Sequence, residues 1–241
     1  MTDSTTARSH GEEPHLPGLA QRLNWLRAGV LGANDGIVST AAVAVGVAGA
    51  TDAVGPVFLA GAAALVGGAI SMALGEYVSV SSQRDSEHAL IAKETEELRT
   101  DPDAEFEELV GLYEKEGLSH ETARTVAKEL TEKDALRAHL SLELNIDPDD
   151  VVSPWHAALA SAVAFTIGAL LPLLTILLIP APVRVAWTFV AVLVALAVTG
   201  YVAAWIGGAV RWRSMLRTVI GGALALAATF LVGTLFGTAI G

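Results

Sequence analysis

The sequence predicts an all-α membrane protein with five transmembrane helices and an acidic three-helix insert between the second and the third. Hydrophobic residues make up 52% of the 241 residues, yet the chain has 26 acidic and 15 basic residues. Apolar and charged residues must therefore be segregated. Residues 81–152 hold 20 of the acids and 8 of the bases. We expect a separate acidic domain there, flanked by membrane helices over residues 22–80 and 153–241.

The first two apolar runs follow an N-terminal segment without one. Residues 1–21 are expected to be a disordered tail and not a signal peptide. The first run covers residues 28–50, and a helix of this length spans about 35 Å, enough for one crossing. The second run covers about residues 57–79. Asp52 is placed to cap its start, and Pro56 suits its first turn.

Helix signals divide the insert into three parts. The first helix continues the second span, and the second begins at Asp101 and Pro102, a cap followed by a first-turn proline. The third is expected over residues 119–144, and residues 131–134 (TEKD) resemble a capping box that would restart it partway. Residues 147–150 would then link the insert back to the membrane.

Three further apolar runs, over residues 155–179, 183–206 and about 215–240, bring the number of crossings to five. An odd number puts the two termini on opposite sides. The positive-inside rule favours a cytosolic N-terminus and a cytosolic insert, because Arg184 alone falls on the other side. The arginines on the cytosolic side would be Arg22, Arg27, Arg84, Arg211, Arg213 and Arg217. The short loops and the lack of a targeting segment favour a bacterial cytoplasmic membrane.

Several functions are excluded or disfavoured by composition and motifs. The chain has no cysteine, so thiolate metal sites and cysteine nucleophiles are impossible. It has no Walker phosphate loop, no Gly-x-Ser-x-Gly and no His-Glu-x-x-His, which favours a protein that is not an enzyme and has no prosthetic group. The formal net charge of −11, without a basic aromatic face, disfavours nucleic-acid binding.

Asp35 is an acidic residue inside the first span, where a charge costs about 2.5 to 3.5 kcal/mol on insertion scales. One interpretation is that Asn34, Asp35 and Gly36 mark a break in the helix whose backbone groups satisfy the carboxylate. The other is that Asp35 coordinates a cation or exchanges protons within a pathway.

The second span carries two neighbouring stripes if it is helical. Gly68, Met72 and Glu76 lie four apart, so a thioether and a carboxylate share one face and could hold a borderline transition metal. Alternatively, Met72 fills a packing gap and Glu76 pairs with Arg84 or faces water. The adjacent stripe consists of small residues that would let a second helix approach closely. Its members are Gly67, Ser71, Gly75 and Ser79.

The insert contains three pairs of possible metal ligands, each pair spaced to share a helix face. They are Glu94 with Glu97, Glu105 with Glu108, and His139 with Glu143. On spacing alone, a solvated acidic helix face is the usual explanation of such pairs. As a cluster, carboxylates with one imidazole would suit Fe²⁺, Mn²⁺ or Zn²⁺.

Two long stretches, NWLRAGVLGANDGIVSTAAVAVGV and GAISMALGEYVSVSSQRDSE, precede the acidic insert and three more spans. Over residues 22–240 this order resembles the vacuolar iron transporter family, whose members are dimers with five membrane helices per subunit. They export Fe²⁺, and often Mn²⁺, in exchange for protons. The resemblance implies that Asp35 and Met72 line a pathway between subunits, with Glu76 close by. It also implies that residues 81–152 form a cytosolic metal-binding domain of three helices. In this domain the residues that match the family's acidic metal ligands are Glu94, Glu97, Glu105, Glu108 and Glu143.

The chain departs from the family pattern in two places. His139 and Leu140 stand where eukaryotic members carry two methionines, which puts the ion preference in question. Asn24 and Ala28 stand where the family has an acid before the first span, so the route of proton coupling is expected to differ.

These observations lead to one principal hypothesis: a homodimeric antiporter in a lipid bilayer that exports Fe²⁺ and Mn²⁺ from the cytosol in exchange for protons. The first alternative is a membrane-anchored metal sensor or store without transport. A di-iron membrane enzyme would require two Glu-x-x-His motifs, and the chain has none.

Overall fold

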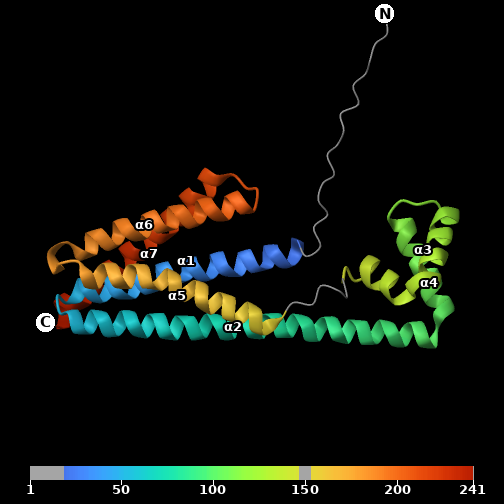
Figure 1. The fold of residues 1–241 in the computed structure, drawn as a ribbon, viewed down its shortest axis with the longest axis horizontal. Helices are drawn as coiled ribbons and strands as arrows, with labels where there is room; N and C mark the ends of the chain where they lie inside the picture. Colours follow the sequence, from blue (N-terminus) through green and yellow to red (C-terminus); the bar gives the residue numbers. More distant parts are fainter. Residues whose placement is uncertain (1–18, 147–152, 241) are drawn as a thin grey trace, which may run out of the picture.

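The computed structural model describes residues 19–146 and 153–240, and these parts of the chain form seven helices (Figure 1). Five of them are long and apolar enough to cross a membrane, which confirms the predicted all-α fold with five spans. The helices are α1 (Leu19–Ala50), α2 (Val54–Thr100), α3 (Pro102–Lys115), α4 (His120–Leu142), α5 (Pro154–Leu178), α6 (Ala181–Ile206) and α7 (Arg211–Ile240).

Helix α1 lies at the centre of the membrane bundle and contacts α2, α5, α6 and α7. Its approach to α5 is close because glycines replace side chains at the contact. A Cβ atom on Gly36 would overlap the carbonyl of Phe165, and one on Gly168 would overlap the carbonyl of Ala33. Small residues at such a contact allow two membrane helices to pack backbone against backbone. The sequence of α1 therefore fixes where α5 lies.

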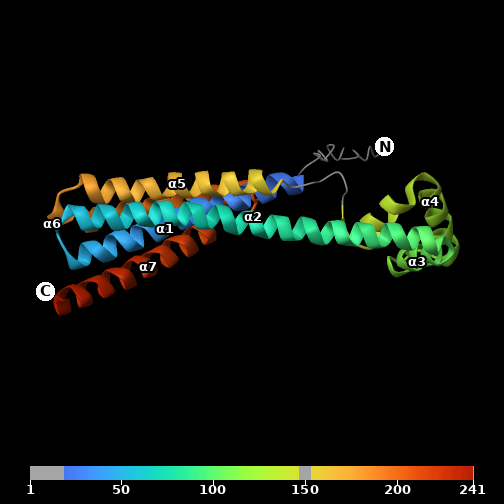
Figure 2. The same cartoon turned by 90° about the horizontal axis from the view of Figure 1, so that it is seen from below.

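Helix α2 joins the membrane bundle to the insert (Figures 1 and 2). It has 47 residues and is therefore about 70 Å long, more than twice the thickness of a bilayer's hydrocarbon core. Its first half packs beside α1 and α5, and its second half carries α3 and α4. The predicted continuation of the second span into the insert is thus a single continuous helix.

Helices α3 and α4 pack against each other around a small apolar core, whose buried members include Leu109, Val110 and Ala127. The predicted cap at Asp101 is present, and Ser119 caps the start of α4. The Asp101 carboxylate accepts a hydrogen bond from the backbone N–H of Ala104 at 3.3 Å, and the Ser119 hydroxyl accepts one from Thr122 at 3.4 Å. Capping satisfies backbone donors that the first turn leaves without a partner.

Helix α4 is interrupted at Asp134, which has extended dihedrals (φ −168°, ψ 93°). The helix restarts there, because the Asp134 carboxylate accepts a hydrogen bond from the backbone N–H of Arg137 at 3.0 Å. A restart in this region was expected, but the prediction that Thr131 caps it is wrong. The hydroxyl of Thr131 is buried and makes no hydrogen bond with any described group. The cap has to be the residue whose backbone leaves the helix, and that is Asp134.

The turn between α1 and α2 also differs from expectation. Asp52 does not cap α2, since Ala53 occupies the cap position and its N–H bonds to the Thr51 hydroxyl. The turn is instead held by Arg184 of α6, which is 2% exposed and donates to the Thr51 carbonyl at 3.0 Å. The Asp52 carboxylate lies 3.9 Å from the same guanidinium.

Two predicted boundaries shift. Helix α1 begins at Leu19, so residues 19–21 belong to it and not to the expected tail. Helix α7 begins at Arg211, four residues before the predicted start of the last span. Residues 1–18 of the expected tail and the expected linker at 147–150 lie outside the described residues.

Candidate metal centre

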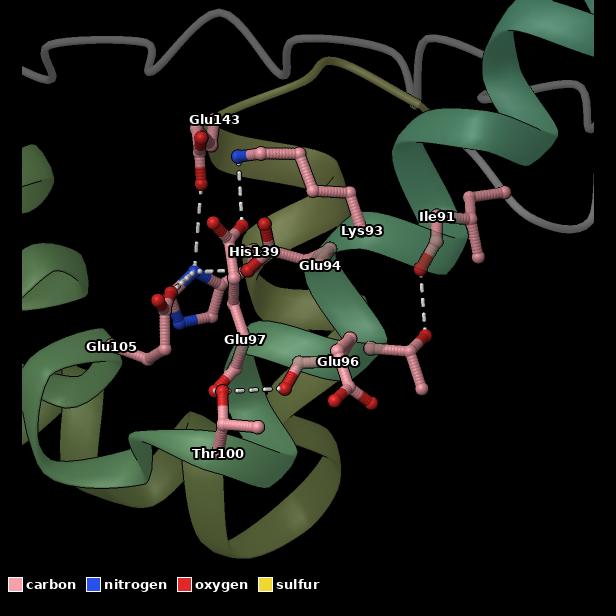
Figure 3. Close-up of polar contacts among 10 residues, drawn as sticks. Ile91, Lys93, Glu94, Glu96, Glu97, Thr100, Glu105, His139 and Glu143 are labelled. Carbon is pink, nitrogen blue, oxygen red and sulfur yellow. Dashed lines mark hydrogen bonds and ion pairs between the residues drawn. The ribbon is translucent and has the colours of Figure 1, made fainter.

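Three helices of the insert bring a histidine and two glutamates together (Figure 3). Glu94 comes from α2, Glu105 from α3 and His139 from α4, and one possible ligand atom from each lies within 4.8 Å of the others. The Nδ1 atom of His139 is 3.0 Å from Oε1 of Glu94 and 3.8 Å from Oε2 of Glu105. Glu143, one turn after the histidine, places Oε2 3.6 Å from the same nitrogen. We call these four residues the metal cluster.

Local sequence explains how the metal cluster is assembled. The chain turns out of α2 after Thr100, where the Asp101 cap starts α3 and sets Glu105 in its first turn. The restart at Asp134 gives the last part of α4 a new direction, and His139 and Glu143 are on this part. Two caps therefore decide how the two later helices present their ligands to α2.

The centre of the metal cluster is buried without being satisfied. Glu94, Glu105 and His139 are 3%, 8% and 1% exposed. Although Nδ1 of His139 and Oε1 of Glu94 are close together, neither makes a hydrogen bond with any described group. Leaving a buried polar atom without a partner costs about 1 to 3 kcal/mol, and such atoms are rare in native proteins. A cation between the two atoms would satisfy both.

Burial and mutual repulsion perturb the carboxylates. Burial raises the pKa of Glu94 above its ordinary value, and the charge of Glu143 raises it further. Burial likewise raises the pKa of Glu105, with the charge of Glu108 adding to it. Both residues lie in the insert, beyond the apolar half of α2. Crowded carboxylates with raised pKa values are typical of a site that binds a cation.

The other two predicted ligands lie differently. The Glu97 carboxylate points to Lys93, whose Nζ atom is 2.8 Å away, and both side chains are partly exposed. Glu108 is exposed on α3 and reaches the metal cluster through its charge on Glu105. The structure thus brings four of the six predicted ligands around Nδ1 of His139 and leaves Glu97 and Glu108 at the periphery.

Asp35 lies in an unbroken helix, so the interpretation that it marks a helix break is wrong. Its carboxylate is half-buried and accepts a hydrogen bond from the Ser39 hydroxyl at 2.5 Å. The neighbouring Asn34 faces another way, and its side-chain oxygen accepts a hydrogen bond from Thr199 of α6, also at 2.5 Å. The two polar residues of this span therefore have separate partners.

The side of α1 that carries Asp35 is incompletely covered. An apolar groove of about 480 Å³ lies between α1 and α7, and its lining includes Ala42 and Gly46. These two residues continue the stripe of α1 that begins with Asp35 and Ser39, because the spacings are four, three and four residues.

The two predicted stripes of α2 have different surroundings. Met72 and Glu76 are half-buried, and Glu76 does not pair with Arg84 among the described ion pairs. Gly68, on the same stripe, packs against the ring of Phe165. On the stripe of small residues, a Cβ atom added to Gly67 or Gly75 would meet no atom within 4 Å. This stripe faces outward from the single chain.

Sequence reasoning missed three polar residues in the membrane bundle. Arg184 ties the start of α6 to the α1–α2 turn, Thr199 ties α6 to Asn34 of α1, and Ser39 supports Asp35. Ser39 had a detectable signal, since it lies four residues after an acid on the same helix face. Arg184 and Thr199 act on residues more than 100 positions away, so no local pattern reveals them.

The fold and the metal cluster together define a class: a multi-pass membrane protein with an insert outside its membrane bundle, where grouped side chains could hold a metal ion. Comparison with known sequences agrees with this class. The model of the VIT family matches residues 26–234, and the chain belongs to this family.

The chain is similar to several curated relatives. It is 44% identical to a vacuolar iron transporter of Acanthamoeba castellanii, over 88% of this chain and 78% of the relative. It is 37% identical to vacuolar iron transporter homolog 1 of Arabidopsis thaliana, over 91% and 86% of the two chains. Vacuolar iron transporter homolog 1 of Oryza sativa is 36% identical, over 98% of this chain and 86% of the relative.

Proposed function

We propose that this protein is a membrane transporter that exports divalent transition metals, Fe²⁺ and also Mn²⁺, from the cytosol in exchange for protons. The observation that carries the proposal is the pair of buried, unsatisfied ligand atoms on His139 and Glu94. The names of the relatives, vacuolar iron transporter and its homologues, agree with the choice of metal. On this proposal the protein is not an enzyme, and the metal is its cargo.

The insert would gather metal from the cytosol. Three carboxylates around one imidazole provide hard oxygen ligands and one borderline nitrogen, a donor set that suits Fe²⁺, Mn²⁺ and Zn²⁺. The excess of acids over residues 81–152 raises the local concentration of cations before any ligand is engaged. Glu97 and Glu108, at the periphery, would contribute to this attraction or join the metal once it has bound.

Within the membrane, the cation would pass along Asp35, Met72 and Glu76. Protonation of a carboxylate from the far side would release the metal, because a ligand must be deprotonated to bind. The half-buried position of all three side chains is compatible with this role. The hydrogen bond from Ser39 would keep the Asp35 carboxylate oriented while it exchanges protons and metal.

A homodimer would complete this pathway. Two features support it: the small-residue stripe of α2 has no neighbour in the single chain, and an apolar groove lies along the stripe of α1 that begins with Asp35. Helices with small residues at the surface pack closely against a second helix in membranes. A second copy placed there would bring two sets of pathway residues together.

The proposed orientation puts the N-terminus and the insert in the cytosol and the C-terminus on the opposite side. The odd number of spans and the arginines at the insert end of the bundle support it. The proposed location is a bacterial cytoplasmic membrane. The names of the relatives place those proteins in the vacuole.

The test is metal flux into proteoliposomes, measured for Fe²⁺ and Mn²⁺ with and without an imposed pH gradient. We expect proton-dependent flux that Asp35→Ala abolishes and that Glu94→Gln with Glu105→Gln weakens at low metal concentration. Asp52→Ala is the matched control, because Asp52 is an exposed acid outside the proposed pathway. Full flux through Asp35→Ala would show that the pathway assignment is wrong.

The alternative function, a membrane-anchored metal sensor or store, rests on a specific observation. Among the described residues, the group of side chains placed to hold a metal lies in the insert and not in the membrane bundle. This alternative predicts metal binding that depends on His139 and no flux under any pH gradient. The same proteoliposome experiment therefore separates the two functions.

A further inference from the structure

The last part of the chain has a one-sided charge distribution. Residues 153–240 contain four arginines, no lysine and no acidic residue. Arg184 is buried at the α1–α2 turn, and the other three lie in the first two turns of α7. They are Arg211, Arg213 and Arg217, and all three are exposed. We call them, with the α6–α7 turn, the basic rim.

None of the three arginines forms an ion pair in the described part of the chain. Arg211 donates a weak hydrogen bond to the Tyr201 hydroxyl at 3.3 Å and lies over the ring of that residue. Arg213 lies 5.9 Å from the ring centre of Trp212. These contacts orient the guanidinium groups without neutralising them. The positive end of the α7 macrodipole adds to their field, and the first turn of α7 has no acid to offset it.

The basic rim lies at the level of lipid headgroups. The turn joins the end of α6 to the start of α7, both of which are membrane-spanning helices, so it must lie at a membrane surface. Trp205 and Trp212 are exposed there, and tryptophans at this depth are typical of the headgroup region. Arg217 lies about 9 Å further along α7, within reach of the same region when its side chain extends toward water. In Figure 1 this turn is at the end of the bundle that faces the insert.

We propose that the basic rim is a binding surface for the headgroups of anionic phospholipids. The guanidinium groups and the helix N-terminus supply positive charge and hydrogen-bond donors to a phosphate diester at the bilayer surface. The flanking tryptophans supply amphipathic rings at the same depth. The acidic insert on the same side repels an anionic bilayer, whereas the basic rim attracts one. This inference does not depend on metal transport.

The test uses the purified full-length protein in a neutral detergent. The thermal midpoint is measured while phosphatidylglycerol or phosphatidylcholine of the same acyl chains is added. A ligand that binds the folded state raises the midpoint, so we expect phosphatidylglycerol to raise it by several degrees more than phosphatidylcholine does. High salt should reduce the difference, because the attraction is electrostatic. Inorganic phosphate alone should not reproduce it.

The variants locate the effect. Arg213→Gln should lose part of the difference between the two lipids, and the combined change of all three arginines should lose most of it. Arg99→Gln and Arg124→Gln are matched controls, because these exposed arginines lie in the insert and are paired with Glu96 and Glu107. Native mass spectrometry of the wild type with an equal mixture of phosphatidylglycerol and phosphatidylcholine shows which lipid stays bound, and it needs no variant. Equal stabilisation by both lipids, or an undiminished difference in the triple variant, would overturn the proposal.

Discussion

Nδ1 of His139 and Oε1 of Glu94 are buried ligand atoms of the metal cluster, and neither makes a hydrogen bond with any described group. Replacing His139 by alanine removes the nitrogen ligand and opens the centre of the metal cluster. We expect His139→Ala to weaken Mn²⁺ binding by at least about tenfold, or about 1.4 kcal/mol. Isothermal titration of the full-length protein with Mn²⁺, which is stable toward oxidation in air, measures this loss.

The matched control for that variant is His120→Ala. His120 is also in α4, but it is exposed and paired with Glu114 at 2.9 Å, away from the metal cluster. Its removal should leave Mn²⁺ affinity unchanged. Equal losses in the two variants would mean that the histidines act through overall charge or folding, and not as ligands.

The raised pKa of Glu94 predicts a pH-dependent stability in the metal-free protein. A carboxyl whose pKa is higher in the folded than in the unfolded state binds protons more tightly when folded, so stability falls as the pH rises through the folded pKa. Glu94→Gln mimics the neutral carboxyl. At neutral pH the metal-free variant should therefore unfold at a higher temperature than the metal-free wild type.

This advantage should shrink as the pH falls toward the ordinary carboxyl pKa of 4.5, where the wild-type side chain becomes neutral as well. Saturating Mn²⁺ should reverse the order, because it stabilises the protein that binds it. Thermal unfolding from neutral to mildly acidic pH, with and without Mn²⁺, checks both statements. A difference between the two proteins that does not change with pH would contradict the assignment of a raised pKa.

At the scale of the helix, Asp134 decides the direction of the segment that carries His139 and Glu143. Asp134→Ala removes the cap of this segment, which typically costs about 1 kcal/mol. Because the segment presents two members of the metal cluster, we expect weaker Mn²⁺ binding in addition to lower stability. Asp134→Asn should restore both, since asparagine caps helices as well as aspartate does. Titration calorimetry and thermal unfolding measure the two effects.

Ser119→Ala provides the comparison, because Ser119 caps the start of the same helix. It should lower stability by a similar amount without changing Mn²⁺ affinity. If both alanine variants lowered the affinity equally, the effect would come from general loosening of α4. The position of the cap relative to His139 would then be irrelevant.

At the scale of the whole molecule, two adjacent glycines of α2 separate folding from assembly. A side chain at Gly67 meets no atom of its own chain, whereas one at Gly68 overlaps the ring of Phe165. We expect Gly67→Leu to fold but to form monomers, because the added side chain keeps a second helix away. Gly68→Leu should destabilise each subunit instead. Light scattering after size-exclusion chromatography, together with thermal unfolding, distinguishes the outcomes, and an intact dimer in Gly67→Leu would exclude this face as the interface.

The sequence by itself determined the organisation of the chain. The five apolar runs, the long acidic segment and the cap at Asp101 are all local features, and the structure has five membrane-length helices and this cap at the predicted places, with shifts of a few residues at helix starts. Local features are predictable because hydrophobic length, charge density and capping depend on residues only a few positions apart. The resemblance to the vacuolar iron transporters was also present in the sequence, and the family match agrees with it.

The tertiary structure decided which side chains meet. Spacing placed six possible ligands on helix faces, but the packing of α2, α3 and α4 turned Glu94, Glu105 and Glu143 toward His139 and left Glu97 beside Lys93. Likewise, Arg184 holds a turn that lies 133 residues away in the sequence. Such contacts depend on how helices are placed relative to one another. That placement comes from the packing of whole surfaces, and no local pattern contains it.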